Sequence, residues 1–232
     1  MAQAESHFLI QMFRNILRDY KELFSDRKHS ISIIWGILLF GIALIIQAVA
    51  NRYVGQVVSI AVPDLILDHI PAYDIDALII KAVLFVTAVT FILIIMRPKC
   101  FGFGLKTLAL FIITRSVMIS LTHLGANPHQ LMFSPHDFGY SVYNLLYNST
   151  NDFFFSAHTG APLLVALIYW QERKVRYFYI TTAILFGASM LIAHIHYSID
   201  VAAAPFMTYG IFHAAKILFR RDYDFSRGIL KG

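Results

Sequence analysis

Long apolar runs separated by short polar segments dominate this chain. Five of the runs have or approach roughly 20 residues, the length that an α-helix needs to cross the apolar core of a bilayer. One further run is shorter and becomes long enough only if its helix begins near Ser156. The runs are Ile31–Ala50, Ala77–Met96, Phe103–Leu121, Gly160–Trp170, Val175–Ile195 and Val201–Phe219. This pattern predicts an all-α, polytopic membrane protein with six transmembrane helices.

The segment before the first run has a different pattern, in which apolar residues recur at helical spacing between Glu5 and Phe24. Three basic residues fall on the opposite side of such a helix: Arg14, Arg18 and Lys21. This pattern is typical of an amphipathic helix that lies in the plane of the membrane interface. The alternative is a helix that packs on the cytoplasmic ends of the bundle.

Composition agrees with a membrane protein, because 58% of the 232 residues are hydrophobic and 14% are charged, against about 25% charged residues in soluble domains. The first apolar run is too long and too far along the chain for a cleaved signal peptide, so we interpret it as a signal anchor. We expect three parts: a cytoplasmic amphipathic helix over 1–30, a six-helix membrane domain over 31–219 and a cytoplasmic tail over 220–232.

Lysine and arginine are unevenly distributed over the loops. With a cytoplasmic N-terminus and six spans, 16 of the 19 basic residues fall on the cytoplasmic side and 3 on the other. Positive charge marks the cytoplasmic side of membrane proteins, so both termini are expected there. The net charge of +5 then reflects topology and attraction to anionic lipid, and nucleic acid is not an expected partner.

Histidine and aspartate gather on the exoplasmic side, in loops at about 51–76, 122–157 and 193–200. The second loop ends in FFFSAHTGAP, whose apolar tip, Phe153–Phe155, either dips into the outer leaflet or packs between spans. Ser156 can cap the following helix, which places His158 and Thr159 in its first turn. Free N–H groups and the helix dipole make this a site for an anion such as phosphate. The alternative is that His158 is merely an interfacial histidine.

The third of these loops reads AHIHYSID. His196 and Asp200 are four residues apart and would share a face of a helix. An aspartate that accepts a hydrogen bond from one imidazole nitrogen leaves the other nitrogen to act as nucleophile or base. The alternative is a structural ion pair. A metal site formed by His194 and His196 is disfavoured, because alternate residues of a helix point nearly opposite ways, and no metal is expected.

Arg115 lies inside the third apolar run, in LFIITRSVMIS. A guanidinium at that depth must face the bundle or a water-filled cavity, where it can bind a phosphate through two parallel hydrogen bonds. The alternative is that Arg115 pairs with Asp152 or another outer acid. Both can hold, because a carboxylate can orient an arginine that binds phosphate.

These stretches resemble the motifs of the sphingomyelin synthase family, within the type 2 phosphatidic acid phosphatase superfamily. SAHTG is similar to the family's S-G-H-T, and AHIHYSIDV is similar to A-H-D-H-Y-T-[IV]-D-V. RSVMISLTHLG, which begins at Arg115, resembles R-[SC]-[VI]-T-M-Y-V-T-T-L-P, and Asp152 matches an aspartate four residues before the first-motif serine. VPDLILDHIP is a weaker match to the first outer loop. The resemblance covers about residues 31–219.

The resemblance implies a reaction and the residues that perform it. His196 would attack the phosphorus of a phospholipid and form a phosphohistidine intermediate, assisted by Asp200. His158 would protonate the departing diacylglycerol oxygen and then act as base on the acceptor hydroxyl, usually that of ceramide. His194 would orient the site or hydrogen bond a neighbour. The expected substrate- and phosphate-binding residues are Arg115, Ser156, Thr159, Asp152 and His194.

The chain also departs from related families. The lipid phosphatases of the superfamily have a Lys and Arg motif, and an arginine where this chain has Met190. A phosphomonoester is close to a dianion at neutral pH, whereas a diester is a monoanion, so a site with Arg115 as its evident arginine favours head-group transfer. Ala157 replaces a glycine of the first motif. LGANPHQ replaces L-P-V-P-G in the outer loop, and this second change leaves the identity of the substrate open.

The expected function is transfer of phosphocholine or phosphoethanolamine from phosphatidylcholine or phosphatidylethanolamine to ceramide or a similar lipid alcohol, releasing diacylglycerol and using no cofactor. The alternative is a lipid phosphate phosphatase or a phospholipase C-like hydrolase. A non-enzymatic lipid-binding or scrambling protein is disfavoured by the set His158, His196 and Asp200. The sequence leaves the oligomeric state open, a homo-oligomer included.

Overall fold

The computed structural model describes residues 2–57, 60–130, 139–147 and 153–229. In these ranges the regular structure is helical, apart from one isolated bridge between Ile60 and Leu124, so the all-α prediction is confirmed. The longer helices are α1 (Ala2–Ser25), α2 (Arg27–Gln56), α3 (Asp76–Met96), α4 (Phe101–Thr122), α7 (Arg173–Ile192) and α8 (Ser198–Leu218). The shorter ones are η1 (Leu67–His69), η2 (Pro98–Cys100), α5 (Tyr140–Tyr147), α6 (Ala157–Ile168) and α9 (Arg220–Ser226).

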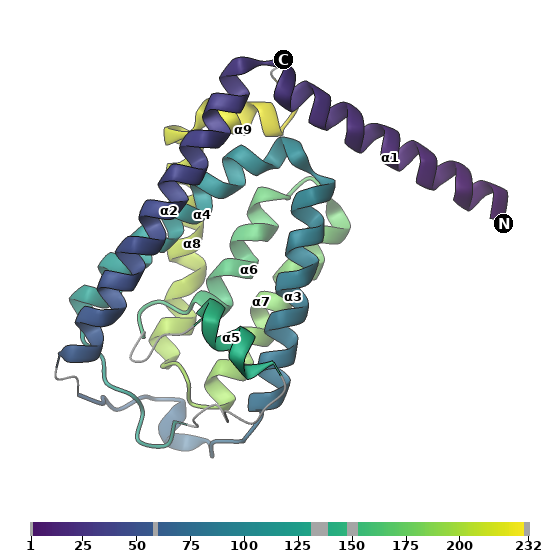
Figure 1. The fold of residues 1–232 in the computed structure, drawn as a ribbon. Coiled ribbons are helices and arrows are strands. Elements are labelled where there is room, and N and C mark those ends of the chain that lie inside the picture. The colour runs from purple at the N-terminus through teal and green to yellow at the C-terminus, as the bar shows by residue number, and fades with distance from the viewer. Residues whose placement is uncertain (1, 58–59, 131–138, 148–152, 230–232) are drawn as a thin grey trace.

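Five helical segments in the described ranges are long and apolar enough to cross a membrane: α2, α3, η2 with α4, α7 and α8. Helix α6 has 12 residues and spans about 18 Å, which is less than the roughly 30 Å of a bilayer core. It nevertheless lies inside the bundle, beside α7 and α8 (Figure 1). Each predicted apolar run therefore forms a helix, and the count of six membrane-spanning helices stays a prediction.

Helix boundaries differ from the expected runs where local capping decides them. Helix α2 begins at Arg27, before Ile31, because Asp26 caps it by accepting the N–H of Lys28 at 2.8 Å. Helix α7 ends at Ile192, three residues before the predicted end of its run. The long predicted loop 122–157 also contains helix α5, which no periodicity had indicated.

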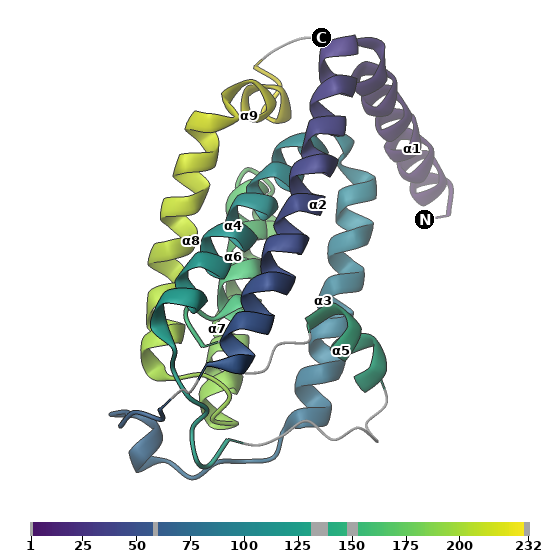
Figure 2. The same ribbon diagram turned by 60° about the vertical axis from the view of Figure 1, so that its left-hand side comes forward.

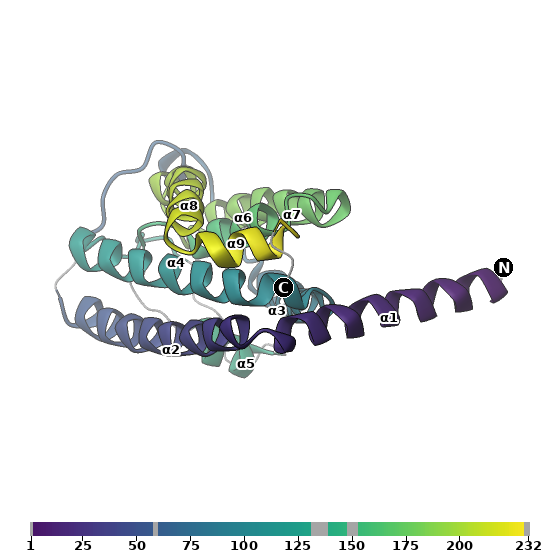
Figure 3. The same cartoon turned by 90° about the horizontal axis from the view of Figure 1, so that it is seen from above.

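Helix α4 is the central element of the bundle. It packs against α2 on one side and against α8 and α6 on the other, an arrangement that is clear when the molecule is seen from above (Figure 3). The main core cluster forms where α4, α6 and α8 meet, around Phe111, Leu164 and Phe212. In the view turned by 60°, α2 still runs alongside α4, and α8 lies at the left-hand edge of the bundle (Figure 2).

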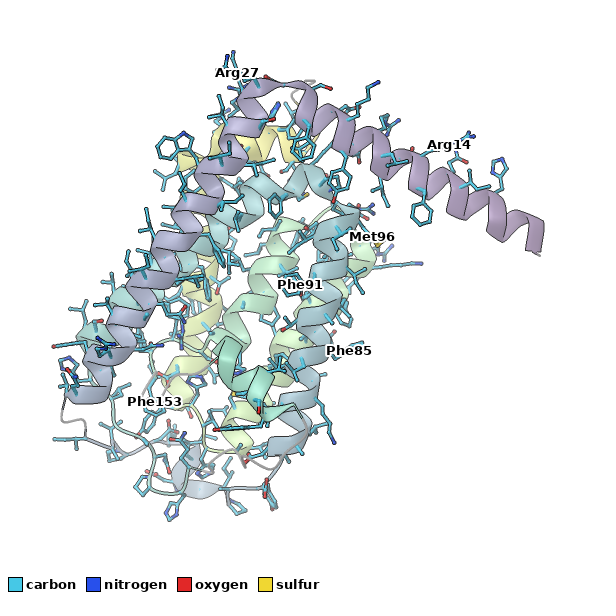
Figure 4. All side chains as sticks on the ribbon, in the orientation of Figure 1. Arg14, Arg27, Phe85, Phe91, Met96 and Phe153 are labelled. Atoms are coloured by element: carbon cyan, nitrogen blue, oxygen red, sulfur yellow. The ribbon has the colours of Figure 1, made fainter. Side chains whose placement is uncertain are left out.

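The outward surface of the long helices is apolar. Phe85 and Phe91 on α3 are each 61% exposed, and Trp35 on α2 is 63% exposed. Figure 4 shows Phe85, Phe91 and Met96 following one another along α3. In water this much exposed apolar area is unfavourable, whereas in a bilayer it matches the lipid chains. The structure is therefore consistent with an integral membrane protein.

Helix α1 projects away from the bundle (Figures 1 and 3), but its final turns are held. Lys99 forms ion pairs with Asp19 at 3.1 Å and with Glu22 at 2.5 Å, and Tyr20 donates to the carbonyl of Ile95 at 3.1 Å. Phe13 remains 60% exposed. That α1 lies in the membrane interface stays a prediction, and these contacts fix where the helix leaves the bundle.

The predicted inner loops meet at the end of the bundle that carries α1 and α9. Buried Lys106 of α4 pairs with Asp222 of α9 at 2.7 Å, and Asp222 also accepts from Ser32 of α2 at 2.6 Å. Arg97 pairs with Glu172 at 2.9 Å, which joins the α3–α4 and α6–α7 connections. The residues predicted on one side thus lie together, and the assignment of that side to the cytoplasm stays a prediction.

Gly160 of α6 faces Thr208 of α8 and Phe111 of α4. A Cβ there would lie 2.8 Å from Thr208 Oγ1 and 3.0 Å from two ring carbons of Phe111. We expect Gly160→Ala to lower the free energy of unfolding by about 1–3 kcal/mol, because α6 must shift away from both neighbours. Thermal unfolding in detergent measures the effect. Gly210→Ala is the control, since a Cβ at Gly210 meets nothing within 4 Å. Equal melting temperatures for the two variants would contradict the prediction.

Candidate active site

The N-terminus of α6 has the predicted geometry. Ser156 is fully buried and caps the helix by accepting the N–H of Thr159 at 3.4 Å. His158 lies in the first turn and is partly exposed. The Thr159 hydroxyl donates to Ser156 Oγ at 3.3 Å, and the side chain lies against Gly187 of α7. Both hydroxyls therefore face the protein interior, whereas His158 keeps partial exposure.

The second motif lies in the turn between α7 and α8. His196 is 4% exposed and Asp200 is fully buried, and Nδ1 of His196 is 3.4 Å from Oδ2 of Asp200. The expectation that the pair shares a helix face needs correction, because α8 begins only at Ser198. Asp200 lies in the first turn of α8, where it also accepts the N–H of Tyr197 at 3.1 Å. The carboxylate thus caps the helix and reaches back to His196.

The two motifs are joined directly, although they are about 40 residues apart in the sequence. The backbone N–H of Ser156 donates to the carbonyl of Asp200 at 3.1 Å. The rings of His158 and His196 lie edge to face with their centroids 6.0 Å apart. Both imidazoles are therefore close enough to flank a single phosphoryl group.

Arg115 comes to this site from α4 and is 6% exposed. Its Nε donates to the carbonyl of Phe155 at 2.8 Å, and its charge interacts favourably with Asp200. Phe153 and Phe155 are buried. Phe155 packs in the core cluster of α4, α6 and α8, whereas Phe153 packs against Leu67 and Tyr197. Figure 4 shows Phe153 at the end of the bundle opposite Arg27. Asp152, the expected partner of Arg115, lies outside the described residues.

Tyr143 of α5 is a site residue that sequence reasoning missed. Its hydroxyl is 3.0 Å from Nε2 of His158, and the two rings are nearly parallel, with centroids 6.3 Å apart. Tyr143 is buried and packs with residues of α3 and α7. No motif marks this tyrosine, because its role depends on how α5 folds back onto the bundle.

His194 lies in the same turn as His196, two residues earlier in the chain. It has a left-handed backbone with φ of 55° and is 2% exposed. One of the two expected roles, a hydrogen bond to a neighbour, is not seen: within the described ranges, neither ring nitrogen has a hydrogen-bond partner. That His194 orients the site stays a prediction. The described residues also contain no group of three His, Cys, Asp or Glu side chains placed to hold a metal ion.

The first outer loop packs over the turn that carries His196. Asp64 accepts from the backbone N–H of Ser198 at 2.7 Å and from its hydroxyl at 2.6 Å. Tyr197 donates to the carbonyl of Gly125 at 2.9 Å and accepts the N–H of Val62 at 3.3 Å. Two outer segments, distant from this turn in the sequence, therefore hold it in place.

The stability of this outer assembly should depend on pH through Asp64. Burial alone would raise the pKa of Asp64, but hydrogen bonds from Ser198, Leu67 and Ile66 lower the pKa below its ordinary value of 3.8. A group with a lowered pKa in the folded state stabilises the fold above about pH 4, and the contribution is lost as the pH falls through the folded-state pKa.

We expect Asp64→Asn to have a lower melting temperature than the wild type near pH 6, and the difference to shrink toward pH 3. Melting curves of the two proteins across this range test the prediction. Asp74→Asn, at an exposed aspartate of the same loop, should follow the wild type. A pH-independent difference between wild type and Asp64→Asn would show that the charge of Asp64 contributes nothing.

The part of the chain that carries the two motifs is similar to a known protein family. The family model described as PAP2 superfamily C-terminal matches residues 149–217, which contain Ser156, His158, His196 and Asp200. The match supports the type 2 phosphatidic acid phosphatase superfamily and does not identify the sphingomyelin synthase family within it. No curated protein and no solved structure matches the chain. The superfamily supports an enzyme that performs a phosphatase- or phosphotransferase-type reaction on a lipid.

Proposed function

We propose that the protein transfers a phosphate-linked head group, phosphocholine or phosphoethanolamine, from a glycerophospholipid to ceramide or a similar lipid alcohol. The observation that carries the proposal is the convergence of two imidazoles, 6.0 Å apart, with Asp200 behind one of them and Arg115 nearby. One imidazole can then attack phosphorus, while the other donates a proton to the leaving oxygen and accepts a proton from the acceptor hydroxyl.

In the first step, His196 acts as nucleophile. Nδ1 faces Asp200, so a proton on Nδ1 leaves the lone pair of Nε2 for attack on phosphorus. The bond from phosphorus to the diacylglycerol oxygen breaks, and His158 donates a proton to that oxygen. In the second step, His158 takes the proton of the acceptor hydroxyl, the acceptor oxygen attacks phosphorus, and the bond to Nε2 breaks.

The charges of the site support a diester as substrate. Among the described residues, Arg115 is the buried cation at this end of the bundle, whereas Arg52 and Lys81 are exposed. One guanidinium balances the single negative charge of a phosphodiester better than the charge of nearly two on a monoester. Tyr143 orients the ring of His158 through its hydrogen bond with Nε2.

The test is an assay of purified protein with labelled phosphatidylcholine or phosphatidylethanolamine, with and without ceramide. We expect a labelled sphingophospholipid that requires ceramide, together with diacylglycerol in equal amount. Water can replace the acceptor in the second step, so slow hydrolysis of the donor without ceramide is also expected. If phosphorylated head group is released and added ceramide yields no labelled lipid product, the result would favour the hydrolase and contradict transfer.

The site is proposed to face the exoplasmic side, with both termini in the cytoplasm. The distribution of lysine and arginine supports this orientation, and the grouping of α1, α9 and the basic loops at one end of the bundle is compatible with it. Labelling of single introduced cysteines at Tyr73 and at Ser226, in a Cys100→Ala background, tests it in intact cells. An impermeant reagent should modify the first position only.

A further inference from the structure

A cavity of about 550 Å³ lies between the first outer loop and the turn before α8. The loop residues Leu67, Asp68 and Ile70 form one part of its wall, and His129 and His194 also line it. The volume lies within the range of about 300–1,000 Å³ that is typical of small-molecule sites. The mechanism above does not use this cavity.

His194 is the reason to assign a ligand to it. Its imidazole is 2% exposed, and neither ring nitrogen has a hydrogen-bond partner within the described ranges. A buried polar group without a partner destabilises the fold, and His194 also adopts a left-handed backbone, which is uncommon for histidine. Both features are understandable if a bound molecule supplies the missing hydrogen bonds.

The chemistry of the wall limits what that molecule is. A neutral imidazole has one nitrogen that donates and one that accepts, so its partner must do both, as a hydroxyl or an amide does and an ammonium does not. Asp68 contributes a carboxylate, whose Oδ2 accepts the N–H of Asp64 at 2.9 Å. Among the described residues, no lysine or arginine lines the cavity. A phosphate is therefore disfavoured here, whereas it is favoured beside Arg115.

We propose that this cavity binds the uncharged, hydroxyl- and amide-bearing head of the acceptor alcohol, and that His194 determines acceptor specificity. The proposal rests on the proposed transfer function. His194 and His196 lie in the same short turn, so an acceptor held at His194 is near the nucleophile that carries the head group. The donor phosphate beside Arg115 and the acceptor head in the cavity then occupy two separate sites that differ in charge.

The test compares variants that share a backbone conformation. His194→Asn keeps a residue that tolerates the left-handed region and removes the imidazole. His123→Asn is the matched control, because His123 is also left-handed, with φ of 48°, and does not line the cavity. Asp68→Asn removes the charge and keeps an oxygen for the N–H of Asp64. The probe is short-chain ceramide, and binding is followed by the shift in melting temperature, with steady-state kinetics for acceptor and donor.

We expect His194→Asn to raise the apparent Kd and the KM for short-chain ceramide about tenfold, as for the loss of a hydrogen bond to a buried group, and to raise the KM for the donor lipid much less. Asp68→Asn should change ceramide binding in the same direction, and His123→Asn should behave like the wild type. Unchanged ceramide binding in both His194→Asn and Asp68→Asn would overturn the proposal, as would a rise confined to the donor KM.

The cavity proposal and the function proposal fail in different ways. Ceramide binding that depends on His194, in a protein that only hydrolyses its donor, would contradict transfer and leave the cavity assignment standing. Transfer to ceramide with an unchanged acceptor KM in His194→Asn would contradict the cavity assignment alone.

Discussion

Replacing His196 with alanine is expected to lower the rate of head-group transfer by at least about a thousandfold, because the proposed nucleophile of the covalent intermediate is lost. Phosphate-labelled donor lipid should leave an acid-labile label on the wild-type protein during turnover and none on His196→Ala. Activity and labelling are thus two independent readouts of one residue.

The controls for His196→Ala separate chemistry from folding. His213→Ala, at a partly exposed histidine of α8, should keep activity within about twofold of the wild type, as is usual for a side chain remote from the site. Melting temperatures of both variants show whether the bundle is intact. A folded His196→Ala protein that still transfers the head group, or still carries the acid-labile label, would contradict the mechanism.

Replacing His158 with alanine is expected to reduce transfer from natural lipids by about 10²–10⁴-fold, the usual contribution of a general acid and base. The same variant should release p-nitrophenol rapidly from p-nitrophenyl phosphocholine, because this leaving group needs no proton. One equivalent per enzyme is expected, followed by slow turnover, since the acceptor still requires a base. The phosphohistidine should therefore accumulate.

Burst kinetics with the activated ester distinguish this role from a merely structural one. Tyr143→Phe removes the hydroxyl that lies 3.0 Å from Nε2 of His158 and keeps the ring, so it should slow the natural reaction less than His158→Ala. If His158→Ala slows natural and activated substrates equally and shows no burst, His158 is not the acid for the leaving group.

The candidate site was predictable to the extent that its residues belong to short local patterns. Ser156 and His158 follow from a cap placed before an apolar run, and Asp200 follows from its position at the start of the last run. The spacing of four residues correctly predicts contact between His196 and Asp200, but His196 precedes the helix and does not share a helix face with Asp200. The contact arises because Asp200 in the first turn of α8 reaches back to a residue that precedes the helix.

Residues whose role depends on distant segments were beyond such reasoning. Tyr143 reaches His158 only because α5 folds back onto the bundle, and Asp64 holds Ser198 across 134 residues of sequence. The cavity at His194 has walls from the first outer loop and from the turn before α8. No spacing rule relates these segments, since their proximity results from packing of the whole outer end.

Hydrophobic runs and the placement of positive charge predict a helical membrane protein and position the ends of its helices within six residues, because transfer of each segment into lipid is a local property. The position of those helices relative to one another, by contrast, depends on contacts between distant segments. Residues of α4, α6 and α8 pack in one core cluster, and a backbone hydrogen bond from Ser156 to Asp200 joins the two histidine motifs. The catalytic geometry therefore depends on close packing between segments that the sequence keeps apart.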